Sequence, residues 1–249
     1  MRLYLSSERF GNHVYKLKGM VSGNRVAIIE NAVDFISLED RQSYQKNVYD
    51  IKDAFSQLGF DAEYFDLRSY FKEPNKSKIE DDLKKFDLVW VCGGNVFLLR
   101  RAMYLSGFDT AICNLIDNDA VCYGGWSAGI SVLSPSLKGL EFCDSPFELA
   151  DGYTDGIIWD GLNVLDSLLI PHHNSSHPEN PKIETAIFYS NKNNIRNTTL
   201  RDGDVLIVNN NGTEILKYEE GTDHPANRNK VSPTRETMIS KIGRLFSPE

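Results

Sequence analysis

The chain has 249 residues, of which 41% are hydrophobic and 25% are charged, a composition typical of a globular protein with one large α/β domain. Its formal net charge is −8, its pI is about 5.2 and it carries no basic stripe, so we expect no nucleic-acid partner. The apolar stretches are short and interrupted by charges, so we also expect no membrane-spanning helix.

The N-terminal segment MRLYLSSERFGNH has neither the apolar core nor the small-residue cleavage site of a signal peptide, so we expect a cytoplasmic protein. Strands and helices then alternate along the first half of the chain. Short apolar or β-branched runs predict strands at 2–6, 25–30, 61–67, 87–91 and 120–125. Helical patterns cover residues 37–59, 76–86, 96–105 and 108–119. This alternation predicts an α/β fold with a mostly parallel, doubly wound sheet and helices on both faces.

The second half of the chain contains fewer predicted elements. A strand runs over 162–170 up to Pro171, a helix covers 180–193, and a hairpin turns at Asn211–Gly212. The tail is charged, and a short helix is predicted near 237–245. Because there is no internal repeat and no long linker, residues 1–249 are predicted to form a single domain.

A serine lies where the fifth predicted strand ends and a helix begins. Ser127 is flanked by Gly125 and Gly129, which is the G-x-S-x-G pattern of a nucleophile elbow. In such an elbow the serine backbone is strained, and glycines avoid collisions with the neighbouring strand and helix. The amide of Ala128 then opens a helix and can stabilise an oxyanion. The simpler alternative is a tight turn in which Ser127 caps a helix.

A second glycine turn precedes the elbow in the chain. Cys92–Asn95 connects a predicted strand to a helix, and an amide near Gly93 and Gly94 is the predicted second oxyanion donor. The alternatives are a simple strand–helix turn or a phosphate cradle. Neither G-x-G-x-x-G nor a GK[ST] motif is present, so a nucleotide site is the weaker interpretation.

A nucleophilic serine needs a base, and histidines follow the predicted strand that ends at Pro171. We expect His172 to face the serine and His173 to face the opposite side, because side chains alternate along a strand. His172, His173 and His177 could instead bind a metal ion, but their spacing matches no HExxH-type motif. The sequence therefore predicts neither a metal nor a cofactor. The cysteines form no CxxC pair and are predicted to be buried thiols: Cys92, Cys113, Cys122 and Cys143.

Three segments together, CGGNVF at 92–97, GWSAG at 125–129 and IPHH at 170–173, resemble the peptidase E family of aspartyl dipeptidases and their cyanophycinase-like relatives. The resemblance implies a class I glutamine amidotransferase-like fold, with Ser127 as nucleophile and His172 as general base. The family's third catalytic residue is a glutamate in a P-E-G segment before a late strand. Asp202, in LRDGDVLIV, occupies the matching place and would orient the imidazole.

The chain departs from this family at several positions. Cys92 replaces the first glycine of the turn, and Val96 replaces a small hydroxyl residue. The arginine that the aspartyl dipeptidases carry after the histidine segment is missing, and Lys182 is the only basic residue nearby. Since lysine is a point charge and not a planar fork, aspartyl specificity is not expected.

The substrate contacts are predicted at three residues: Asn95, Asp144 and Lys182. Asp144 could bind a free substrate amine or cap a turn. The sequence thus predicts a serine hydrolase acting on small peptides, and it leaves a homodimer open. Two alternatives remain: a catalytically silent relative that binds a peptide or small metabolite, and another serine amidase or esterase.

Overall fold

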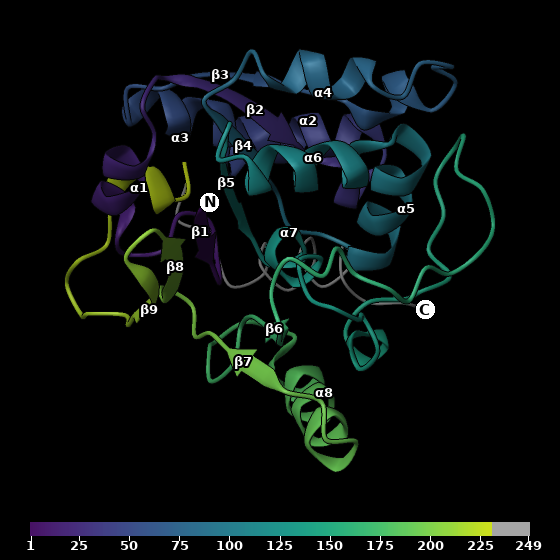
Figure 1. Ribbon diagram of the computed structural model, residues 1–249. Coiled ribbons are helices and arrows are strands. Elements are labelled where there is room, and N and C mark those ends of the chain that lie inside the picture. Colours follow the sequence, from purple (N-terminus) through teal and green to yellow (C-terminus); the bar gives the residue numbers. More distant parts are fainter. Residues whose placement is uncertain (231–249) are drawn as a thin grey trace.

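The computed structural model describes residues 1–230, which are built around a seven-stranded sheet (Figure 1). Its strand order is β3-β2-β4-β5-β1-β8-β9. The first five of these strands are parallel, β8 is antiparallel to β1, and β9 is antiparallel to β8. The strand bounds are β1 (Arg2–Ser6), β2 (Arg25–Ile29), β3 (Asp61–Tyr64), β4 (Leu88–Val91), β5 (Cys122–Trp126), β8 (Val205–Asn209) and β9 (Gly212–Leu216).

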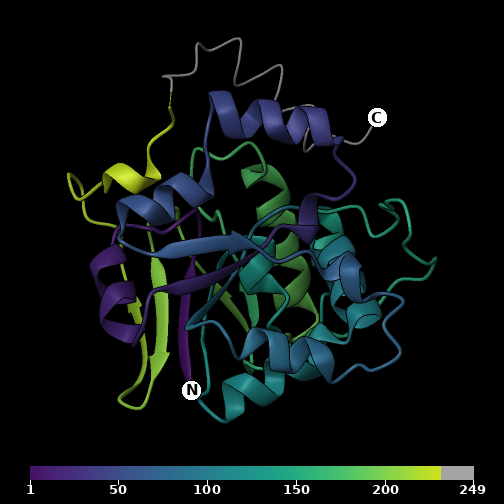
Figure 2. The same cartoon turned by 90° about the horizontal axis from the view of Figure 1, so that it is seen from above.

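Helices connect the parallel strands and cover the sheet on both sides (Figures 1 and 2). They are α1 (Val14–Met20), α2 (Leu38–Asn47), α3 (Ile51–Gln57), α4 (Lys78–Leu83), α5 (Val96–Ser106), α6 (Phe108–Asp117), α7 (Ala128–Ser131) and α8 (Asn180–Lys192). Single 3₁₀ turns are η1 (Asn31–Val33), η2 (Leu67–Tyr70), η3 (Leu140–Phe142) and η4 (Pro225–Asn227). The α/β fold with a mostly parallel, doubly wound sheet is confirmed.

The two faces of the sheet bury separate hydrophobic clusters. In β4, Val89 and Val91 pack into the cluster that includes α4, α5 and α6, whereas Leu88 and Trp90 pack into the cluster that includes α1 and α3. Successive strand residues point to opposite faces, so a strand covered on both sides must be apolar throughout. This requirement explains the unbroken apolar run of β4.

The helix predicted over 37–59 is two helices. α2 ends at Asn47 and α3 begins at Ile51, because the carboxylate of Asp50 accepts hydrogen bonds from the amides of Lys52 and Asp53 and starts a new helix. The side-chain periodicity continues across the break, which is why the sequence pattern did not reveal it.

The strand predicted over 162–170 is shorter and lies outside the main sheet. Only β6 (Leu168–Ile170) is extended, and it pairs in parallel with β7 (Asn197–Thr199), which the sequence did not predict. The preceding residues bond to the loop after α7 instead, with the amides of Leu162 and Val164 donating to carbonyls at residues 132 and 133.

The hairpin of β8 and β9 turns one residue earlier than predicted, because Asn209 pairs with Gly212 and leaves residues 210–211 in the loop. The short helix predicted near 237–245 lies outside the described residues.

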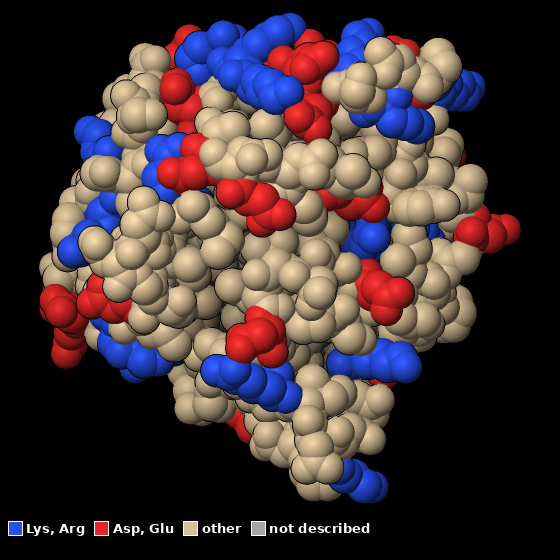
Figure 3. Space-filling model, viewed as in Figure 1, with Lys and Arg blue, Asp and Glu red and all other residues tan. Residues whose placement is uncertain are grey.

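The prediction of buried thiols is correct for two of the four cysteines. All four cysteines are free, with Cys92 and Cys122 buried and the other two half-buried. On the face drawn in Figure 3, acidic and basic side chains are interspersed around broad uncharged areas. Among residues 1–230, no helix is both long and apolar enough to cross a membrane.

Candidate active site

The register of the sheet brings three loops together at one edge. Ser6, the last residue of β1, is aligned with Trp126 at the end of β5 and with Val205 at the start of the antiparallel β8. Residues that follow β1 and β5, and residues that precede β8, therefore meet at the carboxyl edge of the parallel strands. Open α/β sheets place their ligands at this edge.

Ser127 lies on a strained turn between β5 and α7. Its φ is 51° and its ψ is −121°, a backbone conformation that residues with a Cβ rarely adopt. A Cβ at Gly129 would lie 2.1 Å from the carbonyl oxygen of Val91, and a Cβ at Gly125 would lie 2.7 Å from the same oxygen. The elbow can therefore approach β4 this closely only because both positions are glycine.

The structure brings His172 and Asp202 to this serine. Nε2 of His172 lies 3.1 Å from Oγ of Ser127, and Nδ1 of His172 lies 2.7 Å from Oδ1 of Asp202. An ionised carboxylate can only accept a hydrogen bond, so Nδ1 carries the proton and Nε2 presents its lone pair to the serine hydroxyl. His172 is buried, and its φ of 63° is a backbone conformation that only the surrounding structure can impose.

The pKa values of the histidine and the carboxylate shift in opposite directions. Burial alone would lower the pKa of His172, but the hydrogen bond and charge of Asp202 outweigh it and raise the pKa above its usual range. Burial would raise the pKa of Asp202, whereas the hydrogen bond and charge of His172 and a hydrogen bond from Ser7 lower it. Asp202 therefore stays ionised next to the imidazole at neutral pH.

The two neighbouring histidines diverge. The amide of His173 donates to the carbonyl oxygen of Leu200, and its Nε2 lies 3.4 Å from a carboxylate oxygen of Glu184 on α8. The side chain of His173 therefore faces α8 and not Ser127, although His172 lies in a turn beyond the end of β6 and not in the strand itself.

His177 stacks on His172, with ring centroids 3.9 Å apart and an angle of 14° between the ring planes. Burial, together with the charge of His172, lowers the pKa of His177 to about 4, so its ring is neutral at neutral pH. Ligand atoms of His172, His177 and Glu179 lie within 4.8 Å of one another. A shared metal ion would have to lie in the plane of both rings, however, and nearly parallel stacked planes do not meet near the rings.

The glycine turn after β4 contacts the elbow. A Cβ at Gly93 would lie 2.9 Å from Cβ of Ser127, and Gly94 has a φ of 137°. Within residues 1–230, the amides of Gly93, Gly94 and Ala128 have no protein acceptor. The thiol of Cys92 packs into the core beneath this turn, and burial raises its pKa well above the usual value.

The three side chains predicted to contact substrate lie outside the Ser127–His172–Asp202 group. The side-chain oxygen of Asn95 accepts the amides of Phe97 and Leu98 and so caps α5, while its Nδ2 donates to a backbone carbonyl. A carboxylate oxygen of Asp144 accepts the amide of Val96 at 2.8 Å, which is the capping role left open above. Lys182 is half-buried on the first turn of α8. None of these three side chains lines the cavity beside Ser127.

A cavity of about 460 Å³ opens beside Ser127 and His172. Its charged lining residues outside the Ser127–His172–Asp202 group were not predicted from the sequence: Glu8, Arg9, Glu30, Asp40, Arg41 and Glu179. They come from the loop after β1, the end of β2, the start of α2 and the start of α8. No short motif connects these segments, so only the fold reveals that they share one cavity.

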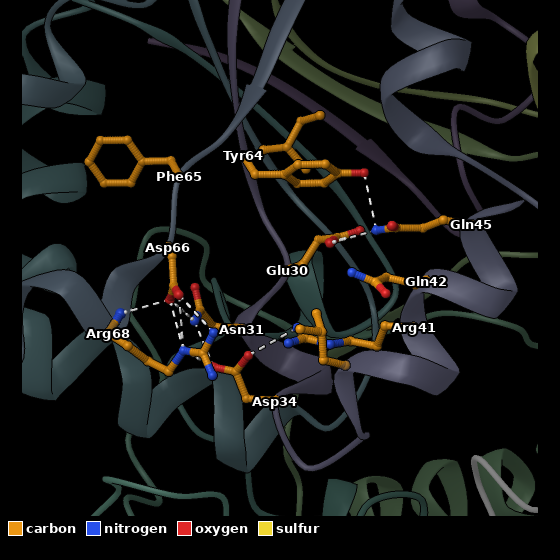
Figure 4. Close-up of a pocket in the computed structure, with 12 residues that line it drawn as sticks. Glu30, Asn31, Asp34, Arg41, Gln42, Gln45, Tyr64, Phe65, Asp66 and Arg68 are labelled. Carbon is orange, nitrogen blue, oxygen red and sulfur yellow. Dashed lines mark hydrogen bonds and ion pairs between the residues drawn. The ribbon is translucent and has the colours of Figure 1, made fainter.

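A second cavity, of about 220 Å³, lies beside the first and shares Glu30, Arg41 and Gln45 with it (Figure 4). Arg41 donates to a carboxylate oxygen of Asp34 at 3.2 Å, and Gln45 donates to both Glu30 and Tyr64. Burial raises the pKa of Glu30 to about 7. The wall between the two cavities is therefore held by hydrogen bonds and ion pairs within the protein.

An α/β sheet with a serine elbow, a histidine and a carboxylate at its carboxyl edge defines a class of hydrolase-like proteins. The chain belongs to peptidase family S51, whose model matches residues 11–216. Among curated proteins it is similar to the uncharacterized peptidase Lin0382 of Listeria innocua, with 31% identity over 124 residues, and to the uncharacterized peptidase Lmo0363 of Listeria monocytogenes, with 30% identity over 125 residues. These alignments cover 50% of the chain and 55% and 57% of the relatives, so the chain spans about half the length of the curated relatives it matches.

Two solved structures share the fold. A crystal structure of a candidate peptidase E protein from Listeria monocytogenes superposes with a TM-score of 0.68 at 22% identity, covering 88% of this chain and 98% of that one. A peptidase from an acI-B1 Actinobacterium superposes with a TM-score of 0.59 at 16% identity, with 87% of each chain covered. The match to peptidase family S51 confirms the resemblance to the peptidase E family, and these two structures confirm the fold.

Proposed function

We propose that this protein hydrolyses short peptides by acyl transfer through Ser127. The observation that carries the proposal is the line of contacts in which His172 lies 3.1 Å from the serine Oγ and 2.7 Å from Asp202, beneath a cavity of about 460 Å³. Nucleophile, base and orienting carboxylate are thus in hydrogen-bond reach in the order that serine hydrolases require.

In the first half of the reaction, Oγ of Ser127 attacks the peptide carbonyl carbon while Nε2 of His172 takes the hydroxyl proton. The carbonyl oxygen becomes an oxyanion, and the amides of Gly94 and Ala128 are the proposed donors to it. Removing one such donor typically reduces the rate by about a hundred- to a thousandfold. The C–N bond then breaks, and His172 gives its proton to the leaving amine.

In the second half, water attacks the serine ester and His172 takes a proton from that water. The ester bond breaks, the released acid departs, and His172 returns the proton to Ser127. Asp202 keeps the imidazole in one tautomer and stabilises its charged form throughout. These steps need only side chains, backbone amides and one water molecule, so the proposed reaction uses no metal or cofactor.

The size and charge of the cavity favour small peptides without a strong aspartyl preference. Ligand cavities span about 300–1,000 Å³, and this one lies at the lower end of that range. Carboxylates outnumber the two arginines in its lining, and both arginines already have partners. Arg41 pairs with Asp34, whereas Arg9 donates to the Asn229 side chain and stacks on Tyr49.

A dipeptide library tests the proposed function. Wild-type protein is incubated with mixtures of dipeptides, and new free amines are measured together with mass spectra of the products. Turnover that disappears in Ser127→Ala is the expected result. If the wild-type protein cleaves no peptide but hydrolyses simple esters or amides through Ser127, the peptidase assignment is wrong. If neither substrate class reacts, the chain is a binding protein.

A further inference from the structure

We infer that Ser7 is a positioning residue that holds the Ser127 elbow, His172 and Asp202 in one arrangement. This inference rests on the proposed function. Ser7 follows β1 directly and is completely buried. It contacts all three residues through two different groups, its side-chain hydroxyl and its backbone carbonyl.

The hydroxyl of Ser7 connects the histidine to the carboxylate. Its Oγ accepts the backbone amide of His172 at 2.8 Å and lies 2.9 Å from Oδ1 of Asp202. Because an ionised carboxylate can only accept, the Ser7 hydroxyl is the donor in its contact with Asp202. The nearest acceptor is Asp202, while the carbonyl oxygen of Leu200 lies further away, at 3.3 Å.

The backbone of Ser7 is also tied to the nucleophile. The carbonyl oxygen of Ser7 accepts the amide of Ser127 at 3.2 Å, and the amide of Ser7 donates to the carbonyl oxygen of Asp204 at 3.2 Å. Since Ser6 is in register with both Trp126 and Val205, the next residue of the chain lies between the elbow and the turn that carries Asp202.

These contacts act on the parts of the site that need support. His172 has a φ of 63°, a conformation that persists only where the surroundings impose it, and its amide is held by the hydroxyl of Ser7. Oδ1 of Asp202 receives both the imidazole and the Ser7 hydroxyl. Two donors on one oxygen fix the carboxylate in the plane from which it orients the ring.

A buried serine could instead only fill space between β1 and β8, and Ser6 provides the matched control. Ser6 is also completely buried, and its hydroxyl donates to the backbone oxygens of Arg9 and Gly125 without contacting Ser127, His172 or Asp202. If both serines only fill space, Ser6→Ala and Ser7→Ala should change thermal stability, and both variants should keep the labelling rate and kcat of the wild type.

The experiment measures the rate at which a fluorophosphonate probe labels Ser127, and kcat and KM for a cleaved dipeptide. We expect Ser7→Ala to reduce both the labelling rate and kcat by about ten- to a hundredfold, the effect of losing a hydrogen bond to a charged group, with KM changed less than about threefold. Ser6→Ala should stay within about threefold of wild type in all three quantities.

A second variant covers the case in which Ser7→Ala does not fold. Ser7→Cys keeps a side chain of similar volume but replaces the hydroxyl with a weak donor, so it should show the same loss. Wild-type labelling rates in either folded variant would overturn the role of Ser7. If the wild-type protein itself is not labelled at Ser127, the proposed function fails first, which separates the two failures.

Discussion

At the scale of single residues, the ionisation of His172 controls the proposed reaction. The base must be neutral to accept the proton of Ser127, so kcat/KM should fall as the pH is lowered through the pKa of His172. Because Asp202 raises that pKa, the midpoint of the acid limb should lie above about 6.5, the usual value for histidine.

Asp202→Asn removes the charge that raises this pKa and leaves the burial that lowers it. We expect the midpoint of the acid limb to move down and the rate to fall by about 10³- to 10⁴-fold, because the tautomer of His172 is no longer fixed. The measurement is kcat/KM from pH 5 to pH 9 for wild type and variant. An unchanged midpoint would show that Asp202 does not act on the base.

The titration of His177 affects the stability of the fold. Its pKa is about 4 in the folded protein and about 6.5 in the unfolded chain. The unfolded state therefore binds more protons between these values, and this histidine destabilises the fold as the pH falls from 6.5 towards 4.

His177→Phe keeps a ring to stack on His172 and removes the titration. Between pH 7 and pH 4.5, the free energy of unfolding should drop less for this variant than for wild type. Urea denaturation at both pH values measures the two drops. Equal drops would mean that His177 is not held neutral in the fold.

At the scale of elements, the elbow between β5 and α7 depends on the absence of a side chain at Gly129. Gly129→Ala places a Cβ 2.1 Å from a backbone oxygen of β4, which cannot move as a flexible side chain would. We expect a loss of more than about 3 kcal/mol in unfolding free energy, in the range of severe overpacking and backbone strain.

Gly19→Ala in α1 is the matched control for Gly129→Ala. A Cβ at Gly19 meets nothing within 4 Å, so this change should be neutral or stabilise the protein by about 0.5–1 kcal/mol. Urea or thermal unfolding of both variants decides the point. A Gly129→Ala protein as stable as Gly19→Ala would show that the elbow tolerates a side chain at this position.

Elements with a strong local pattern were predicted well from the sequence. β4 and β5 are short apolar runs with glycines at or next to their ends, and α5 and α6 have a continuous apolar face, so all four elements were predicted. The break between α2 and α3 was missed because one capping aspartate decides it within an uninterrupted periodic pattern. β7 was missed because the polar residues NTT become a strand only by pairing with β6.

The site was predictable where a motif carries it and not where the fold assembles it. Ser127 and His172 stand in recognisable segments, and Asp202 was found through the family resemblance. Ser7, Glu8 and Arg9 form part of no motif, and they reach the cavity because β1 lies between β5 and β8. Asn95 and Asp144 were predicted to contact substrate because they lie in segments next to the glycine turn and the serine elbow. In the structure both side chains instead accept backbone amides at the start of α5.

At the scale of the whole molecule, the net charge of the cavity lining bears on specificity. An aspartyl substrate would bring a carboxylate into a lining that holds Glu8, Glu30, Asp40 and Glu179. We expect Asp-X dipeptides to be cleaved with less than about a hundredfold advantage over Ala-X dipeptides, which corresponds to about 2.7 kcal/mol of transition-state binding.

Matched Asp-X, Asn-X and Ala-X substrates measure this preference through kcat/KM, on wild type and on Arg41→Ala and Lys182→Ala. A preference for aspartate above a hundredfold would contradict the expectation. Its loss in one of the two variants would then identify the basic group that anchors the carboxylate.

The proposed reaction requires Ser127 to be a nucleophile that His172 activates. The most direct measurement is intact-protein mass spectrometry, with peptide mapping, after reaction with a fluorophosphonate probe. We expect one adduct on Ser127 in wild type and no adduct in Ser127→Ala. Labelling should be slowed at least a hundredfold in His172→Ala and be nearly unchanged in His173→Ala. An unlabelled wild-type protein, or an adduct that persists in Ser127→Ala, would show that Ser127 is not the nucleophile.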